Sequence, residues 1–110
     1  MIIGIAGPYS ASTPAQREKN FDALNEAAAR LLEMGHIPLI GVNAALPVVE
    51  RSEVDDEYKA IMDISLAMLG NCQAVLLVGD SSASQAEIEV VREKGLPVYT
   101  KLEDVPPIES

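Results

Sequence analysis

The segment AVLLV at residues 74–78, followed by GDSSAS at 79–84 and QAEIEVVREK at 85–94, decides the fold of this chain. Five apolar residues in a row are typical of a strand that is buried on both faces. The Ser-rich stretch after them is typical of a loop, and the apolar spacing of the next ten residues predicts a helix that ends before Gly95. Strand, loop and helix in this order form part of a parallel crossover unit.

The same alternation runs through the rest of the chain. We expect further strands at residues 2–6, 37–41 and 97–100. A first helix begins at Ser12 or Thr13, with Pro14 in its first turn, and continues to about residue 34. Residues 43–50, which include Pro47, are expected to form a loop, and Ser52 with Asp55 resembles a capping box ahead of a helix at 54–69.

No segment has the pattern of a β-hairpin, so the strands should be parallel with right-handed crossovers. The predicted fold is α/β: a flavodoxin-like three-layer sandwich, with a parallel sheet of about four or five strands in the order 2-1-3-4 and helices on both faces. Residues 1–110 are expected to form a single domain.

The composition narrows the function classes. A net charge of −9 argues against nucleic acid and against an anionic membrane surface as partners. One cysteine and one histidine offer no plausible metal site and no internal disulfide, and we expect no cofactor. The chain starts without a signal peptide, which predicts a cytoplasmic protein, and a domain of this size favours a homodimer or a higher homo-oligomer.

In the predicted strand order the loops after strands 1 and 3 flank one crevice, where open α/β sheets bind ligands. The first loop supplies Gly7, Pro8, Tyr9 and Ser10, and the second supplies Ser81, Ser82 and Ser84. Small residues let a ligand approach the backbone, and hydroxyls at a helix start bind phosphate or carboxylate. Tyr9 either stacks on a flat ring of the ligand or is a plain surface residue of the turn.

Glu87 shares a helix face with Val90 and Val91, which predicts a partly desolvated carboxylate near this crevice. Such a carboxylate can act as a nucleophile or a base. The alternative is structural: Ser84 and Glu87 have the spacing of a capping box, in which Glu87 reaches back to its own helix start.

Asp63 is the second acidic candidate, because apolar residues surround it in the sequence. It either faces the crevice beside Glu87, where two carboxylates are the equipment for cleaving a glycosidic bond, or lies on the solvated edge of its helix. His36 follows a glycine and precedes a strand, and we interpret it as a surface turn residue rather than a catalytic one.

With these residues in place, the chain resembles the nucleoside 2-deoxyribosyltransferase superfamily, in particular its short bacterial members and the related 2′-deoxynucleoside 5′-monophosphate N-glycosidases. The resemblance covers nearly the whole chain. It rests on four pieces: IAGPYS at 5–10, the Gly35-x-x-Pro38 turn, the Asp63 helix that leads into CQAV at 72–75, and residues 81–87 followed by GLPV at 95–98.

The resemblance implies cleavage of the N-glycosidic bond of a (deoxy)nucleoside or its 5′-monophosphate, so that the partner is a small-molecule nucleoside or nucleotide. By similarity Glu87 attacks the anomeric carbon and Asp63 helps to position the substrate and deliver a proton. Tyr9 and the Gly7 loop line the base and sugar pocket, and Ser81 matches a serine that contacts phosphate in the monophosphate N-glycosidases.

Two departures from the family pattern bear on the reaction. Ala83 stands where the family usually has glycine, and no segment matches the C-terminal asparagine with which full-length transferases complete a neighbour's site. The second departure favours hydrolysis over base transfer. Two other interpretations stay open: a nucleotide-binding module without turnover, and a small oligomeric α/β protein in which Glu87 only caps its helix.

Overall fold

The computed structural model describes residues 1–7, 12–79 and 82–106, and for residues 82–86 it describes the backbone alone. These residues contain four strands and four helices, with two helices between the second and third strands, and a short 3-10 helix follows them. In chain order they are β1 (Ile2–Ala6), α1 (Pro14–Glu33), β2 (Ile37–Ile40), α2 (Gly41–Arg51), α3 (Glu57–Leu69), β3 (Ala74–Leu77), α4 (Ser82–Glu93), β4 (Val98–Tyr99) and η1 (Leu102–Asp104).

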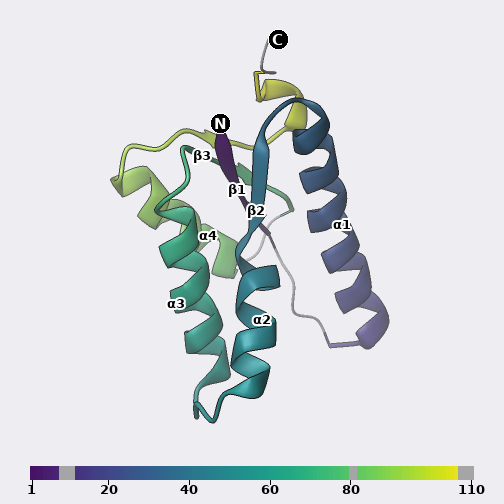
Figure 1. Ribbon diagram of the computed structural model, residues 1–110, viewed down its shortest axis with the longest axis vertical. Coiled ribbons are helices and arrows are strands. Elements are labelled where there is room, and N and C mark those ends of the chain that lie inside the picture. The colour runs from purple at the N-terminus through teal and green to yellow at the C-terminus, as the bar shows by residue number, and fades with distance from the viewer. Residues whose placement is uncertain (8–11, 80–81, 107–110) are drawn as a thin grey trace.

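The four strands form one parallel sheet in the order β2-β1-β3-β4, which confirms the predicted fold class and strand order. Figure 1 shows α1 on one side of the sheet and α3 and α4 on the other. β1 lies between β2 and β3, with Ile5 in register with Ile40 on one side and with Leu76 on the other. The carboxyl ends of these strands therefore meet at one edge of the sheet, where ligands bind in open α/β folds.

The core is divided between the two faces of the sheet. Ile3 and Ile5 pack with Leu24 and Leu31 of α1, and this cluster continues to Val105 after η1. On the opposite face, Ala6, Leu69, Val75, Ile88 and Val91 form a second cluster. The alternation of side chains along β1 and β3 explains the division, because successive residues of a strand point to opposite faces.

α1 begins as the sequence predicts. The side chain of Thr13 accepts a hydrogen bond from the Gln16 N–H at 3.2 Å, and Pro14 occupies the first turn.

α2 was expected to be a loop, and this prediction is wrong. Pro47 lies inside the helix, where its ring removes one backbone hydrogen bond. The helix forms nevertheless because Val42, Ala45 and Val49 recur at helical spacing and are all buried. Packing of this face against α3 and the sheet outweighs the defect at Pro47.

The expected capping box at Ser52 and Asp55 is also wrong. Ser52 ends α2, and α3 begins later than predicted, with Asp56 as its N-cap. The Asp56 carboxylate accepts a hydrogen bond from the Lys59 N–H at 3.0 Å. A carboxylate in this position satisfies an otherwise unpaired N–H group and interacts favourably with the helix dipole.

Candidate active site

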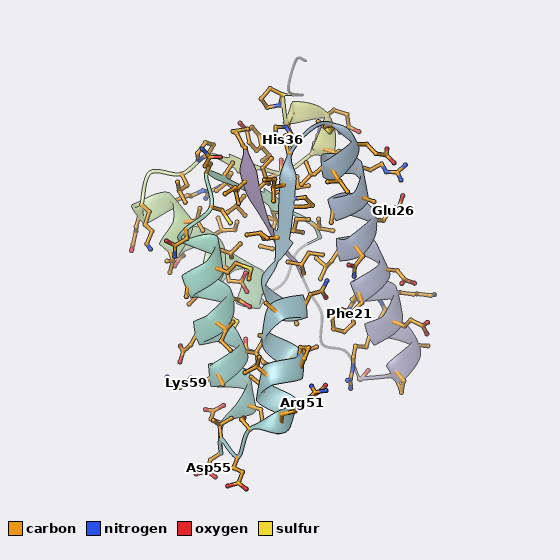
Figure 2. All side chains as sticks on the ribbon, in the orientation of Figure 1. Phe21, Glu26, His36, Arg51, Asp55 and Lys59 are labelled. Atoms are coloured by element: carbon orange, nitrogen blue, oxygen red, sulfur yellow. The ribbon has the colours of Figure 1, made fainter. Side chains whose placement is uncertain are left out.

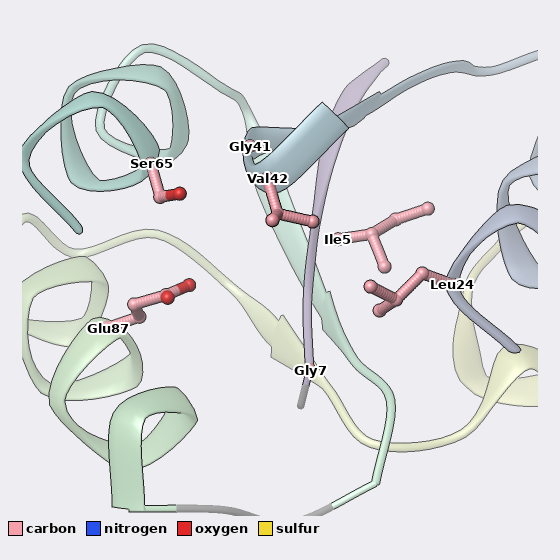
Figure 3. A pocket seen from close by; sticks show the side chains of 7 residues that line it. All are labelled: Ile5, Gly7, Leu24, Gly41, Val42, Ser65 and Glu87. Carbon is pink, nitrogen blue, oxygen red and sulfur yellow. The ribbon is translucent and has the colours of Figure 1, made fainter. Parts of the chain in front are cut away.

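A pocket opens at the carboxyl ends of β1 and β2, between α1, α2, α3 and α4 (Figure 3). The volume in which the centre of a water molecule can lie is about 10 Å³, and the empty space around it, which includes open solvent, is about 270 Å³. We call it the Glu87 pocket. It is lined by Ile5, Gly7, Leu24, Gly41, Val42, Ser65 and Glu87. Ile5, Leu24 and Val42 make an apolar wall, and Ser65 and Glu87 face it with polar groups.

Two glycines let backbone atoms form part of the pocket wall. A Cβ on Gly7 would run into the Val78 carbonyl oxygen and would lie 2.8 Å from Leu24 Cδ2. A Cβ on Gly41 would lie 2.8 Å from Ser65 Oγ and 2.9 Å from Ser65 Cα. Only glycine permits these approaches, so the first turn of α2 sits directly against α3 at Ser65.

The Glu87 side chain reaches the pocket from α4. It is only 8% exposed, because it lies on the helix face that also buries Ile88 and Val91. Among the described residues, no group donates a hydrogen bond to the Glu87 carboxylate, and no positively charged side chain forms an ion pair with it. Burial away from water therefore raises the pKa of Glu87 to about 7. Near neutral pH the group changes between a nucleophilic carboxylate and a proton-donating acid.

This arrangement does not fit the capping-box interpretation of Glu87. α4 begins at Ser82, so Ser84 lies inside the helix rather than at its N-cap. A capping box requires the acidic residue at the third helical position after its N-cap. Glu87 lies further along α4, and its side chain points into the pocket instead (Figure 3).

Ser65 faces Glu87 across the pocket and is a residue that the sequence reasoning missed. It is 5% exposed and shares its helix face with Ile61 and Leu69, one turn to either side. Figure 3 shows the Ser65 hydroxyl and the Glu87 carboxylate directed into the same space. The signal was present in the spacing, since positions four residues apart lie on one face of a helix and a serine in an otherwise buried stripe needs a polar neighbour.

Asp63 does not face the pocket, so the prediction that it joins Glu87 there is wrong. Its side chain is 60% exposed, and Oδ2 lies 2.8 Å from Lys59 Nζ one turn earlier on α3. The Lys59 side chain is 70% exposed and lies on the outer flank of the helix (Figure 2). Two residues along a helix correspond to a rotation of about 200°, which takes Asp63 out of the stripe that contains Ser65.

The remaining predicted site residues are placed as follows. Gly7 lines the pocket. The side chains of Ser82 and Ser84 lie outside the described part of the structure. The positions predicted for the sugar, base and phosphate contacts, Pro8, Tyr9, Ser10 and Ser81, also lie outside the described residues.

His36 is not the surface residue that the sequence suggested. It is 2% exposed, and Nε2 lies 2.7 Å from the Pro106 carbonyl oxygen. Nε2 must donate this hydrogen bond, since a carbonyl oxygen can only accept, and Nδ1 then accepts from the Met1 amino group at 3.1 Å. Figure 2 places His36 at the end of the sheet away from α2. The residue holds Pro106 against the sheet and does not line the pocket.

Two further properties of the described residues bear on the kind of site. No three His, Cys, Asp or Glu side chains within these residues are grouped closely enough to hold a metal ion. None of the helices in the described part of the chain combines the length and the hydropathy that a bilayer crossing needs.

Comparison with known proteins assigns the chain to a family. Residues 1–100 match the model of a domain of unknown function, DUF4406, and the chain belongs to this family. A flavodoxin from Maridesulfovibrio salexigens is 38% identical over 55 residues, which cover 50% of this chain and 37% of that protein. The chain therefore spans little more than a third of that relative's length.

A solved structure shares the fold. The 2-deoxyribosyltransferase from the psychrotolerant bacterium Bacillus psychrosaccharolyticus superposes with a TM-score of 0.67, at 16% sequence identity, over 89% of this chain and 69% of that chain. The likeness confirms, at the level of the fold, the resemblance drawn from the sequence.

Proposed function

We propose that the Glu87 pocket cleaves the N-glycosidic bond of a (deoxy)nucleoside or its 5′-monophosphate, with Glu87 as the nucleophile. The observation that carries the proposal is the buried carboxylate of Glu87, which points into a pocket at the carboxyl ends of a parallel sheet and has no partner among the described residues. The structural likeness to a 2-deoxyribosyltransferase supports the same kind of chemistry.

The reaction follows from the chemistry of a carboxylate at an anomeric carbon. An oxygen of ionised Glu87 attacks C1′ of the sugar; the C1′–N bond breaks, and its electron pair leaves with the base, which takes a proton from water. Water then attacks C1′ of the glycosyl-enzyme ester and transfers a proton to solvent, which releases the sugar and restores Glu87. With a second base in place of water, the same intermediate gives base transfer.

Ser65 takes the position that Asp63 was expected to fill. Its hydroxyl can donate a hydrogen bond to the Glu87 carboxylate or to an oxygen of the substrate. A bond to the carboxylate orients the attacking oxygen, and Ser65 is therefore proposed as a positioning residue. Both side chains are mostly buried, and a hydrogen bond between them is stronger in such surroundings than in bulk water.

The test is release of free base. The protein is incubated with a panel of nucleosides and 5′-monophosphates, with and without a second base, and the products are separated by chromatography. Wild type should release or exchange base, and Glu87→Gln should lose this activity while keeping its fold by circular dichroism. Glu89→Gln, an exposed position on the same helix, is the matched control and should keep full activity. Equal release from Glu87→Gln and wild type would rule out the nucleophile.

A nucleotide-binding module without turnover is the second candidate, and one observation favours it. A hydroxyl, not a second carboxylate, faces Glu87 from α3, whereas glycosidic cleavage commonly uses two carboxylates. This candidate predicts that nucleotides raise the melting temperature of the protein while no base is released.

The proposed active form is a homodimer or a higher homo-oligomer. Val48, Val54 and Tyr58 are large apolar side chains exposed near the connection of α2 and α3. Covering such side chains in a second copy would lower the free energy of a small domain. Analytical ultracentrifugation at micromolar concentration tests this, and a single monomeric species would contradict it.

A further inference from the structure

The Glu87 pocket has the size of one water molecule and a partly polar lining. The volume in which the centre of a water can lie is about 10 Å³, which is close to the smallest space that holds a water inside a protein. Cavities of this size stay dry when only apolar groups line them, and they hold water when they offer two or more hydrogen-bonding partners. Ser65 and Glu87 are the polar side chains among the described residues that line the pocket.

The polar atoms of these two side chains reach space that water can enter. Among the residues that the structure describes, neither the Ser65 hydroxyl nor the Glu87 carboxyl group forms a hydrogen bond, with the other or with a third group. Yet no side-chain nitrogen or oxygen of these residues is both sealed from water and without a partner. The oxygen atoms must therefore touch a water-accessible space, although the residues are only 5% and 8% exposed. Both residues line the Glu87 pocket, which is such a space.

The two side chains approach this space from different helices. Figure 3 shows the Ser65 hydroxyl pointing from α3 and the Glu87 carboxyl group pointing from α4 toward one another. Where two polar groups face each other without a direct hydrogen bond, a water molecule between them can bond to both. The opposite wall consists of Ile5, Leu24 and Val42, whose side chains offer a water no partner. A water in the pocket is therefore held on the side of Ser65 and Glu87.

We propose that one ordered water molecule occupies the Glu87 pocket in the free protein and bridges the Ser65 hydroxyl and the Glu87 carboxyl group. This water belongs to the protein without substrate, so its presence does not depend on the proposed reaction. It fits both protonation states of Glu87, since water donates a hydrogen bond to an ionised carboxylate and accepts one from a neutral carboxyl group. The Ser65 hydroxyl can likewise donate to the water or accept from it.

The bridging water determines how Ser65 acts on Glu87 in the free protein. The hydroxyl reaches the carboxyl group through the water, and the two together replace part of the solvation that burial removes from the ionised form. Glu87 is the one titratable side chain among the described residues that line the pocket, so its ionised form depends on this hydration. A substrate that enters from the open side displaces the water, and Ser65 can then bond directly to the carboxylate or to the substrate.

A high-resolution crystal structure of the substrate-free protein tests the position of the water. The electron density between the two side chains should show one water oxygen at about 2.6–3.2 Å from Ser65 Oγ and at a similar distance from an oxygen of Glu87. A direct hydrogen bond between Ser65 and Glu87 with no water between them would overturn the proposal, and so would a dry space.

A second measurement follows the titration of Glu87 in solution by the carbon-13 resonance of its carboxyl group, which is assigned by its loss in Glu87→Gln. Ser65→Ala removes one of the two partners of the water, and alanine keeps the helix. The acid dissociation constant of Glu87 should fall about fivefold, the effect of one hydrogen bond. Ser52→Ala, the same change at an exposed position where α2 ends, is the matched control and should titrate like wild type. An unchanged titration in Ser65→Ala would overturn the proposal.

Neither measurement uses a substrate, so the water site and the glycosidase proposal fail separately. If base is released from nucleosides while the space between Ser65 and Glu87 is dry, the reaction stands and the water site is wrong. If the water is present and Ser65→Ala shifts the titration while no base is released, the water site stands and the glycosidase proposal is wrong.

Discussion

Ser65 and Glu87 face each other across one pocket from two different helices, and both are more than nine-tenths buried. The pairing depends on Gly41, because any side chain there would collide with Ser65 and move α2 away from α3. The pocket thus holds a carboxylate, a hydroxyl and the open end of a helix around one small space. Four predictions follow from this arrangement and from the buried histidine.

Glu87→Gln should stabilise the protein at alkaline pH. The folded-state pKa of Glu87 is raised to about 7 from 4.5, so the folded protein holds a proton that the unfolded chain releases. Stability is therefore highest below pH 4.5 and falls as the pH rises through about 7. At pH 8 the penalty amounts to about 3 kcal/mol, which glutamine does not incur. Urea unfolding at pH 5 and pH 8 measures it, with Glu89→Gln as the control; an equal gain at both pH values would contradict the assignment.

Release of base should depend on pH through the same group. The nucleophile must be ionised, so kcat/KM should rise as the pH increases and level off above an apparent pKa of about 7. Initial rates of base release between pH 5 and 9 give this profile. A flat profile through neutral pH would show that the ionisation of Glu87 does not control the reaction.

Asp63 and Ser65 should respond oppositely to substitution. Asp63→Asn breaks only an exposed ion pair with Lys59, so its stability should change by less than about 1 kcal/mol and its activity should be retained. Ser65→Ala removes the hydroxyl that faces Glu87 and should lower kcat about tenfold, the effect expected from losing the proposed hydrogen bond to the carboxylate. Steady-state kinetics of both variants shows which of the two residues the reaction needs. A large loss of kcat in Asp63→Asn with no loss in Ser65→Ala would restore Asp63 as the functional residue.

His36→Ala should destabilise the fold without touching the pocket. The change removes a fully buried side chain and the 2.7 Å hydrogen bond to the Pro106 carbonyl oxygen. A loss of about 2–4 kcal/mol is expected from the cavity and the unpaired carbonyl. His36→Gln, whose amide can still donate to Pro106, should recover part of it. Chemical denaturation measures the effect, and a variant as stable as wild type would show that the bond contributes nothing.

The strand order could be predicted because a helical pattern lies between each short apolar run and the next, and parallel crossovers then leave few topologies. The α2 helix could not, because Pro47 and the exposed Val48 hide the spacing of Val42, Ala45 and Val49. This segment is helical because it is buried against α3, and such tertiary packing cannot be read from the local sequence pattern.

The candidate site could likewise be predicted only in part. Glu87 could be placed from helix periodicity, because the strand before it and Gly95 after it fix where the helix lies. Asp63 and Ser65 lie in one apolar segment, and the spacing of Ile61, Ser65 and Leu69 marks the inward face, but the prediction did not use it. The charge of Asp63 drew the prediction, yet Lys59 one turn earlier already offers it a partner in solvent. His36 was misjudged because its acceptor, Pro106, is 70 residues away in the chain.

The unfavourable desolvation of Glu87 has a consequence for protein engineering. Directed evolution that screens only for heat resistance would favour substitutions at position 87, since a neutral residue there avoids the cost of burying a carboxylate. Variants selected in that way would keep the fold and lose the carboxylate at position 87, so such a selection must measure turnover as well as thermal stability.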